Sequence, residues 1–267
     1  MSEYEIIDQI TVSLAREIKD KEKCYTGIAI PTAVVAIQLA RMTHAPALEF
    51  LYGGYWINPD IDVDLFAIMT DLEAFNAAYS RAKGFSRLIS LYNYWEGPKL
   101  TLDFGIIRPA QIDQWANINN SVIGDYHHPK VRFPGGAAVG DIINTCHRVL
   151  AYLPRHDIRT VVEKVDFITG RGASPQWRKE VRLDHYQGLV TIVTDLCIFV
   201  INPLSEKLQI KSIHEYTSTE EVQENTGFSL KIPKDTPVTP PPTKTELELL
   251  RTKVDPLEVR KFDSKER

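Results

Sequence analysis

A short apolar segment, a helix and a second short apolar segment follow one another near the start of the chain, and this unit constrains the fold most. Tyr25–Ile30 is suited to a buried strand, and Pro31 suits the first turn of a helix that we expect over Thr32–Arg41. Leu48–Tyr52 reads as the second strand, which Gly53-Gly54 ends in a turn. Two strands joined by a helix favour a parallel sheet, because parallel neighbours need a crossover connection.

The same alternation of short strands and helices continues along the chain. Further strands are expected at Leu100–Ile107, Val149–Leu153, Val161–Thr169, Leu189–Asp195, Cys197–Asn202 and Leu208–His214. Helices are expected after the capping boxes Ser2/Glu5, Ser218/Glu221 and Thr243/Glu246, and over Phe66–Lys83. We predict one α/β domain over residues 1–236, with an open, mostly parallel sheet flanked by helices. A stiff connector at Pro237–Pro242 would join it to a C-terminal helical arm, so that residues 237–267 form a separate segment.

Composition excludes several classes of protein. The 267 residues carry 31 basic and 35 acidic side chains, a net charge of 31 − 35 = −4, which argues against general nucleic-acid binding. The longest apolar stretches, Gly27–Ala40 and Leu189–Ile201, are shorter than the roughly 20 residues that span a bilayer. The first residues lack the basic start and apolar run of a signal peptide. We therefore expect a cytoplasmic protein without membrane contact.

Cysteine and histidine usage points away from metal and thiol chemistry. The three cysteines are far apart and form no CxxC pair, so neither a disulfide framework nor a thiolate zinc site is expected. Cys146 and Cys197 lie in apolar surroundings typical of inert core thiols. His127 and His128 are adjacent, and adjacent side chains of a strand point to opposite faces, so we expect no metal there. The sequence also lacks GxSxG, GxGxxG and Walker motifs.

The segment Pro109–Asp141 is polar and shows no convincing helix, a property that is often functional in a compact domain. Gly135-Gly136-Ala137 within it offers successive backbone N–H groups, as an oxyanion hole or a phosphate-binding loop requires. A simple tight turn before a helix explains the same residues equally well.

Ile123-Gly-Asp-Tyr-His-His-Pro-Lys130 strongly resembles the β subunit of glutaconate CoA-transferase, a class I CoA-transferase. The loop Pro134–Gly140 lies where that family has its acyl-CoA loop. Further matching segments are Ala110–Lys130, Gly27–Pro46, Val165–Thr169, Val193–Asp195, Glu221–Phe228 and Leu250–Pro256. The resemblance covers nearly the whole chain in order, and it extends to β subunits of a decarboxylase and of a ring-opening hydrolase.

The resemblance implies an open α/β fold of the CoA-transferase and NagB/RpiA-like type. It also implies a homologous α subunit as partner, in a heterodimer or an α2β2 heterotetramer, and an acyl-CoA thioester as substrate with no bound cofactor. In transferases of this family, a β-subunit glutamate at the end of the strand corresponding to Leu48–Tyr52 attacks the thioester and forms a glutamyl-CoA. Gly135, Gly136 and Ala137 are then the expected oxyanion contacts.

This sequence departs from the family pattern at the catalytic glutamate. The position falls within Leu51–Gly53, with Gly53 favoured, and no register in that window supplies a carboxylate. A shifted register would bring Glu49 into play. The decarboxylase relative has a cysteine at this position. Gly53-Gly54, followed by Tyr55 and Trp56, would make room and offer aromatic surface, which suits a bulky acyl group or a water nucleophile. The two aromatic residues suit a subunit interface as well.

Gln111 and His127 complete the pocket candidates, while Gln111, Asp113 and Asn119 also suit a role in holding the loop together. Three functions remain open. The first is an acyl-CoA enzyme with altered chemistry, namely thioester or C–C hydrolysis or decarboxylation, because the glutamate is absent. The second is a genuine CoA-transferase that uses Glu49 or a carboxylate of the partner. The third is a non-catalytic or regulatory subunit on the same fold.

Overall fold

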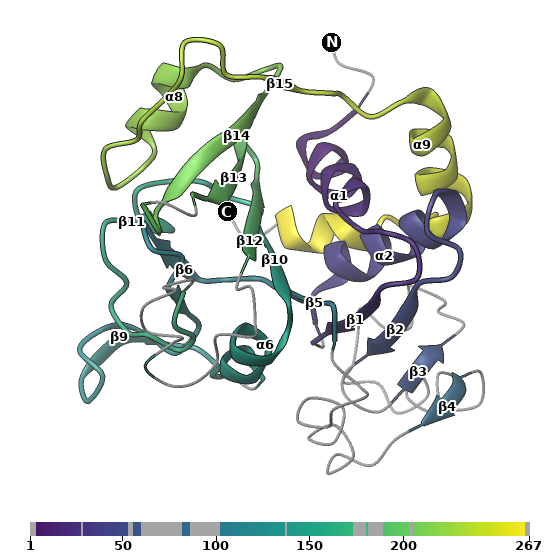
Figure 1. Cartoon of the computed structure of the whole chain (residues 1–267), viewed down its shortest axis with the longest axis horizontal. Helices are drawn as coiled ribbons and strands as arrows, with labels where there is room; N and C mark the ends of the chain where they lie inside the picture. Colours follow the sequence, from purple (N-terminus) through teal and green to yellow (C-terminus); the bar gives the residue numbers. More distant parts are fainter. Residues whose placement is uncertain are drawn as a thin grey trace. The chain divides into compact units, whose positions relative to one another are not determined.

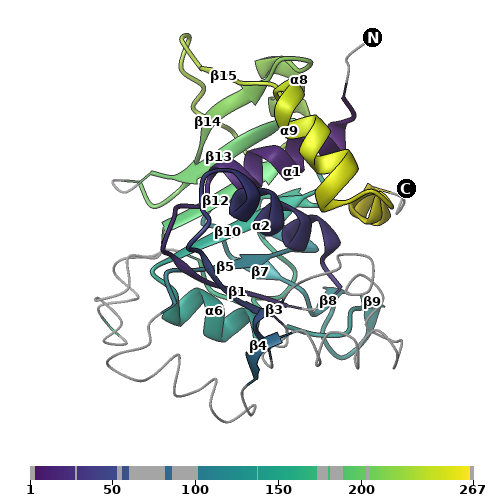
Figure 2. The same cartoon turned by 90° about the vertical axis from the view of Figure 1, so that its right-hand side faces the viewer.

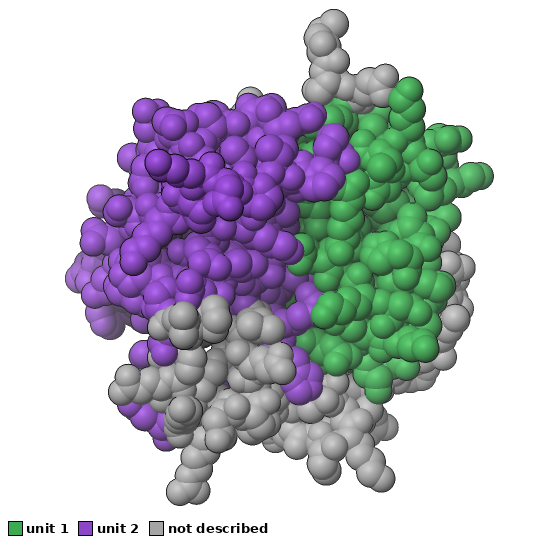
Figure 3. Space-filling view, turned by 45° about the horizontal axis from the view of Figure 1, so that its top comes forward, with its two compact units in different colours: residues 1–106, 242–267 green, residues 107–241 purple. Residues whose placement is uncertain are grey.

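A computed structural model describes most of the chain (Figures 1 and 2). The described residues are 4–27, 29–52, 56–59, 82–85, 102–136, 138–172, 180, 189–202 and 205–264, with the backbone alone at 56–59, 82–85, 145 and 189. The chain divides into two compact units, coloured separately in Figure 3: residues 1–106 with 242–267, and residues 107–241. Each unit is built from both helices and strands, so the α/β class is confirmed. The division of the chain at residue 236 stays a prediction.

Two N-terminal helices belong to the first unit. These are α1 (Ile6–Arg16) and α2 (Pro31–Thr43), and Pro31 occupies the first turn of α2 as predicted. The predicted capping box Ser2/Glu5 is wrong: Glu5 is itself the N-cap residue, and its backbone N–H donates to Asp8 Oδ2 at 3.1 Å. Within α1, Ile10 is fully buried, whereas Ile6, in the first turn, is 43% exposed.

The strands of the first unit confirm the predicted strand–helix–strand arrangement. They are β1 (Lys23–Thr26), β2 (Glu49–Tyr52), β3 (Trp56–Pro59), β4 (Ala82–Phe85) and β5 (Phe104–Ile107). β1 is the middle strand of a parallel trio with β2 and β5, while β3 and β4 extend the sheet beyond β2 as antiparallel neighbours. The predicted helix Phe66–Lys83 lies outside the described residues, except that its last two residues begin β4.

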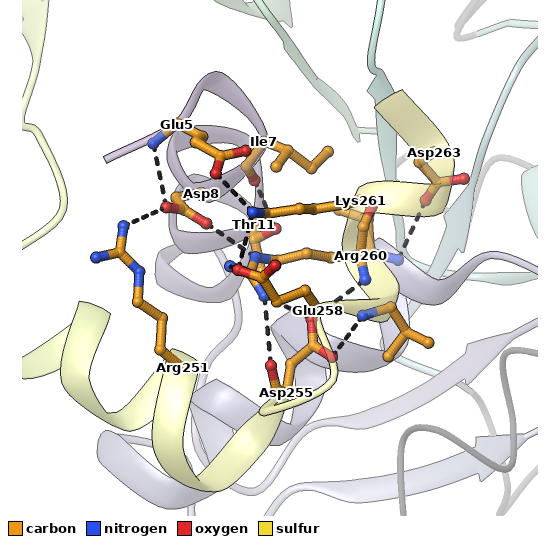
Figure 4. A network of polar contacts seen from close by, with 12 residues as sticks. Glu5, Ile7, Asp8, Thr11, Arg251, Asp255, Glu258, Arg260, Lys261 and Asp263 are labelled. Carbon is orange, nitrogen blue, oxygen red and sulfur yellow. Dashed lines mark hydrogen bonds and ion pairs between the residues drawn. The ribbon is translucent and has the colours of Figure 1, made fainter. Parts of the chain in front are cut away.

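The C-terminal segment packs against the two N-terminal helices. It forms α9 (Lys244–Leu249), a π-helical turn η1 (Leu250–Val254) and a 3-10 helix η2 (Val259–Ser264). The predicted capping box is confirmed, because Thr243 and Glu246 exchange both hydrogen bonds. Figure 4 shows how η2 is held: Arg260, which is fully buried, donates to Asp8 of α1 at 2.8 Å and to Asp255 at 2.7 Å.

The second unit contains a mixed sheet of five strands. These are β10 (Arg148–Leu153), β12 (Leu189–Thr194), β13 (Cys197–Ile201), β14 (Leu208–His214) and β15 (Val238–Thr239). β10 and β12 are parallel, β12, β13 and β14 are antiparallel, and β15 is parallel to β14. The predicted connector Pro237–Pro242 therefore includes a strand, because Val238 and Thr239 pair with the end of β14.

The segment Pro109–Asp141, in which no convincing helix was expected, consists largely of short strands. They are β6 (Gln111–Asp113), β7 (Ile118–Asn119), β8 (Val122–Gly124) and β9 (Pro129–Arg132), followed by the helix α6 (Val139–Thr145). The predicted strand Val161–Thr169 is wrong beyond β11 (Val161–Val162), which pairs with β6. Exposed charged side chains at Glu163, Lys164 and Asp166 interrupt it. The helix α8 (Thr219–Glu224) begins at Ser218, which caps it as predicted.

The three cysteines are buried and are not joined in disulfides, and the burial of Cys146 and Cys197 fits the core position expected for them. Burial raises the pKa of the Cys197 thiol far above its ordinary value. In the part of the chain that the structure describes, no helix is long and apolar enough to cross a membrane. The cytoplasmic location stays a prediction.

Candidate active site

The carboxyl end of β2 is where the sequence places the missing catalytic carboxylate. β1 and β2 run parallel and end in register at Thr26 and Tyr52. Both strands therefore leave the sheet at the same edge, which is where open α/β sheets bind their ligands. Gly53, Gly54 and Tyr55 lie outside the described residues, and Trp56 is described only by its backbone, as the first residue of β3. Their catalytic and pocket roles stay predictions.

Glu49 lies at the other end of the same strand. It is the first residue of β2, its side chain is 49% exposed, and its Oε2 lies 3.9 Å from Nζ of Lys23. Tyr52 is three residues further on, which corresponds to about 10 Å along a β-strand. The Glu49 carboxylate is thus an exposed partner of a lysine at the amino end of the parallel strands.

The glycine loop follows β9 and leads into α6. Gly135 has a φ of 112°, a conformation that residues with a Cβ rarely adopt. A Cβ at Gly136 would collide with the side-chain methyl of Thr169, so the loop passes directly over Thr169. Among the described residues, no hydrogen bond engages the backbone N–H of Gly135 or of Gly136. Two successive donors are therefore available, whereas Ala137, the third predicted contact, lies outside the described residues.

Thr169 is itself fixed by hydrogen bonds on two sides. Its Oγ1 accepts the backbone N–H of Asn120 at 2.9 Å and lies 2.7 Å from Oγ of Ser121. Its backbone N–H donates to the carbonyl oxygen of Ile118 at 2.9 Å. The methyl group that faces Gly136 therefore has little freedom to move. Thr169 was expected at the end of a strand, and its contact with Gly136 was not expected, because the spacing of the two residues in the sequence carries no signal for it.

Gln111 is buried in a cluster of polar side chains. Its Oε1 accepts from Asn119 Nδ2 at 2.7 Å and from the backbone N–H of Asp166 at 3.2 Å. Asp166 Oδ2 in turn accepts from the backbone N–H of Gly124 at 2.9 Å. Gln111 thus ties β6, β7 and β8 to the segment after β11. The geometry fits the expectation that it holds the loop together, and its role as a pocket residue stays a prediction.

Asp113 closes the turn between β6 and β7. Its Oδ1 accepts from the backbone N–H groups of Trp115 and Asn117, each at 3.0 Å, and its Oδ2 accepts from Asn117 Nδ2. Burial raises the pKa of this carboxyl, and the hydrogen bonds from Asn117, Trp115 and Val165 act in the opposite direction. The geometry fits the expectation that Asp113 holds this segment together.

His127 lies in the exposed hairpin of β8 and β9. Its backbone N–H and that of His128 both donate to Asp125 Oδ1 at 2.9 Å. The neighbouring Tyr126 ring stacks on Phe167 at 4.9 Å and lies under the guanidinium of Arg132, also at 4.9 Å. The described residues contain no group of three side chains able to hold a metal ion. The hairpin leads through β9 into the glycine loop, and the pocket role of His127 stays a prediction.

Comparison with known proteins decides the family. Residues 7–225 match the family model described as coenzyme A transferase. The chain is 35% identical over 254 residues to the B subunit of the 3-oxoadipate CoA-transferase of Pseudomonas knackmussii, with 94% of each chain covered. The chain belongs to the coenzyme A transferase family. Its similarity to a B subunit along nearly the whole length makes it a B-type chain of this family.

Two solved structures share the fold of this CoA-transferase family chain. Glutaconate coenzyme A-transferase from Acidaminococcus fermentans matches with a TM-score of 0.83 and 23% identity, covering 96% of each chain. The decarboxylase AibA/AibB matches with a TM-score of 0.78 and 24% identity, covering 96% of this chain and 97% of the other. The family match includes the end of β2, the hairpin and the glycine loop, whereas the C-terminal helices lie beyond it.

His156 is a buried group of this family chain that the sequence analysis did not single out. Its ring nitrogens lie 3.1 Å from Thr194 Oγ1 and 3.0 Å from Thr226 Oγ1, and its backbone N–H donates to Asp195 Oδ1 at 2.7 Å. Burial lowers its pKa to about 4, while the charge of Asp157 acts in the opposite direction. The imidazole is therefore neutral near pH 7 and links the end of β12 to the residues after α8.

Acidification should destabilise the fold through His156. Because the unfolded chain binds the proton more tightly, the stabilisation is complete above about pH 6.5 and is lost as the pH falls toward 4. This group alone should lower the free energy of unfolding by about 2 kcal/mol between pH 7 and pH 5. Urea unfolding at the two pH values, compared with the His156→Gln variant, isolates the effect.

The His156→Gln variant should lose less stability over this interval than the unmodified chain, even if it is less stable at pH 7. The exposed His127 provides the control, because His127→Gln should keep the full pH dependence. If the free energy of unfolding falls equally between pH 7 and pH 5 in the unmodified chain and in His156→Gln, His156 is not the group that titrates.

Proposed function

We propose that this chain is the B-type member of a two-subunit enzyme that acts on an acyl-CoA thioester, and that its glycine loop stabilises negative charge on the thioester oxygen. The observation that carries the proposal is the pair of backbone N–H groups at Gly135 and Gly136, which no described residue engages, in a loop that passes directly over Thr169. Donors held in place before the reaction begins stabilise a developing oxyanion strongly, because they need no reorganisation.

The chemistry differs from that of a glutamate-dependent transferase. Gly53 supplies no carboxylate that could form a mixed anhydride, so no glutamyl-CoA forms on this chain at that position. In thioester hydrolysis, water adds to the carbonyl carbon, the oxygen takes the negative charge, and the C–S bond then breaks. In decarboxylation, the C–C bond breaks, CO2 leaves and the bond electrons pass to the same oxygen as an enolate, which then takes up a proton at carbon. In C–C hydrolysis, water adds to a second carbonyl carbon, which leaves as a carboxylic acid, and the electrons of the broken bond form the same enolate. All three reactions need the same donors.

A homologous α subunit is the proposed partner, in a heterodimer or an α2β2 heterotetramer. The named relatives are themselves parts of larger enzymes: one is a B subunit, and the decarboxylase contains two different chains, AibA and AibB. Any acid or base required by the altered chemistry would come from that partner or from a bound water. Native mass spectrometry of the chain isolated from its own cells should show a stoichiometric partner of similar size. A homo-oligomer would contradict the proposal.

Genuine transferase activity is the second candidate, favoured by the 35% identity to the B subunit of a 3-oxoadipate CoA-transferase. It needs a carboxylate from Glu49 or from the partner. The two candidates separate when the complex is incubated with an acyl-CoA and a free acceptor acid. Acceptor-independent release of CoA or of CO2 is expected from altered chemistry. Rapid CoA exchange with a covalent CoA adduct on this chain would overturn it, and failure to bind thioesters in calorimetry would favour a non-catalytic role.

Replacing Glu49 with alanine should leave turnover within about twofold of the unmodified complex. The substitution removes a surface ion pair with Lys23, and such pairs contribute at most about 1 kcal/mol. Steady-state rates on the purified complex measure the effect. Lys23→Ala is the matched control, because it breaks the same pair and keeps the carboxylate. A loss of more than a hundredfold in Glu49→Ala but not in Lys23→Ala would identify Glu49 as the nucleophile.

A further inference from the structure

The amino end of α2 is capped by a residue from the other end of the chain. Its own N-cap residue, Ile30, has no side-chain oxygen to offer. Asp263 of η2 takes that place: its Oδ2 accepts the backbone N–H of Thr32 at 3.2 Å, and its side chain is buried. The Thr32 hydroxyl donates to the carbonyl oxygen of Arg260 at 3.4 Å. A carboxylate at this position also interacts favourably with the helix dipole.

The helix that carries Asp263 has a fixed position. Figure 4 shows Asp263 on the same short helix as Arg260, whose guanidinium lies between Asp8 and Asp255. Asp255 also accepts the backbone N–H of Val259 at 2.7 Å. The cap on α2 is therefore held by a buried ionic network, so its carboxylate has a defined place.

The capped end of α2 leads directly to the carboxyl end of the parallel strands. The connection from β1 to α2 contains Ala29, which has a φ of 58°, a left-handed conformation that alanine rarely adopts. The connection begins after Thr26, which pairs with Tyr52 at the end of the parallel strands, and the Tyr52 side chain is fully buried. Burial raises the pKa of this phenol, and the backbone of Ala29 acts in the opposite direction. Tyr52 is the last residue of β2, and Gly53 follows it.

We infer that Asp263 is a positioning residue that holds the amino end of α2, and through it the Ala29 loop, against Tyr52 beside the reacting position at the end of β2. The inference rests on the proposed function, which places the chemistry there. A strained loop persists only where its surroundings hold it. Loss of the cap leaves the Thr32 N–H without the Asp263 carboxylate. The first turn of α2 is then less firmly held, so that Ala29 in the preceding loop can leave its left-handed conformation.

The test uses the complex of this chain with its α partner and three variants. Asp263→Ala removes the cap, Asp263→Asn keeps an acceptor oxygen for Thr32, and Glu248→Ala removes an exposed carboxylate of α9 as the matched control. For each we would measure kcat and KM for thioester turnover, the urea midpoint, and hydrogen exchange of the peptide that contains residues 29–36. Asp263→Ala should lower kcat at least tenfold, change KM less than threefold, and speed exchange in that peptide.

Asp263→Asn should restore kcat to within threefold, and Glu248→Ala should match the unmodified complex. An active complex in which Asp263→Ala keeps its kcat overturns the inference alone. An Asp263→Asn variant whose kcat falls as far as that of Asp263→Ala also overturns it. A fall in kcat that accompanies a lower urea midpoint, without faster hydrogen exchange in residues 29–36, overturns it as well. If Asp263→Ala fails to assemble, the kcat of Asp263→Asn and the hydrogen exchange of residues 29–36 test the inference instead. An unmodified complex that neither binds nor turns over thioesters overturns the proposed function, and this inference with it.

Discussion

Replacing Arg260 with methionine should lower the free energy of unfolding by about 3–5 kcal/mol, the range found when one partner of a buried ion pair is removed. Asp8 and Asp255 are both almost fully buried, and each would lose a hydrogen-bonded charge. Asp8 would keep the hydrogen bonds from Arg251 at 2.8 Å and from the backbone N–H of Glu5, so one arginine would remain for a carboxylate that now has two. Urea denaturation of the purified protein measures the loss.

Lys261→Met provides the control for this prediction, because Lys261 is the next residue on the same helix. Its Nζ pairs with Glu5 at 2.6 Å and with Glu258 at 2.8 Å near the surface. Ion pairs of that kind contribute at most about 1 kcal/mol. If the two variants lose the same stability, the buried network does not anchor the C-terminal segment in the way that its geometry indicates.

Gly136→Ala should reduce thioester turnover by about a hundredfold, since loss of one oxyanion donor costs about that much in other enzymes. The added Cβ would collide with the methyl of Thr169, which two hydrogen bonds hold in place, so the loop must move and its donors with it. CoA release by the complex, followed with a thiol reagent, measures the effect. The urea midpoint of the variant shows whether the fold is intact.

The double variant Gly136→Ala with Thr169→Ser tests the cause of that loss. Serine lacks the methyl that collides and keeps the hydroxyl that bonds Asn120 and Ser121. We expect most of the turnover to return in the double variant, a coupling that independent sites would not show. Gly140→Ala is the control, because a Cβ there lies 3.7 Å from the nearest atom, the Thr169 carbonyl oxygen. An unrescued double variant would mean that Gly136 acts by another route.

Sequence patterns predicted the parts of the fold that depend on local chemistry. Pro31 and the box Thr243/Glu246 begin helices where expected, because caps and proline act within one turn. The strands around Val149–Leu153 and Leu208–His214 were found because each is a long apolar or alternating run. The two-residue strand β15 was missed: it exists because β14 pairs with it, and nothing in its own composition requires it.

The candidate site divides in the same way. Adjacent glycines indicate an unusual backbone conformation, so Gly135 and Gly136 could be selected from the sequence. In the structure Gly135 has a positive φ. Thr169 and Asp263 did not stand out, because each acts on a residue far away in the chain. A threonine after an apolar run and an aspartate near the C-terminus have no spacing that would reveal such a contact.

The first compact unit is built from both ends of the chain, with residues 107–241 between them in the sequence, and this sets an order for folding during synthesis. Asp8 meets Arg260 only after a further 252 residues have been made. At about 5–20 residues per second, that delay is roughly 10–50 s. Until then the C-terminal helices cannot pack against α1 and α2, and Asp263 cannot cap α2. The inserted unit has all of its own strands earlier, so we expect it to fold first on the ribosome and the two-ended unit to close last.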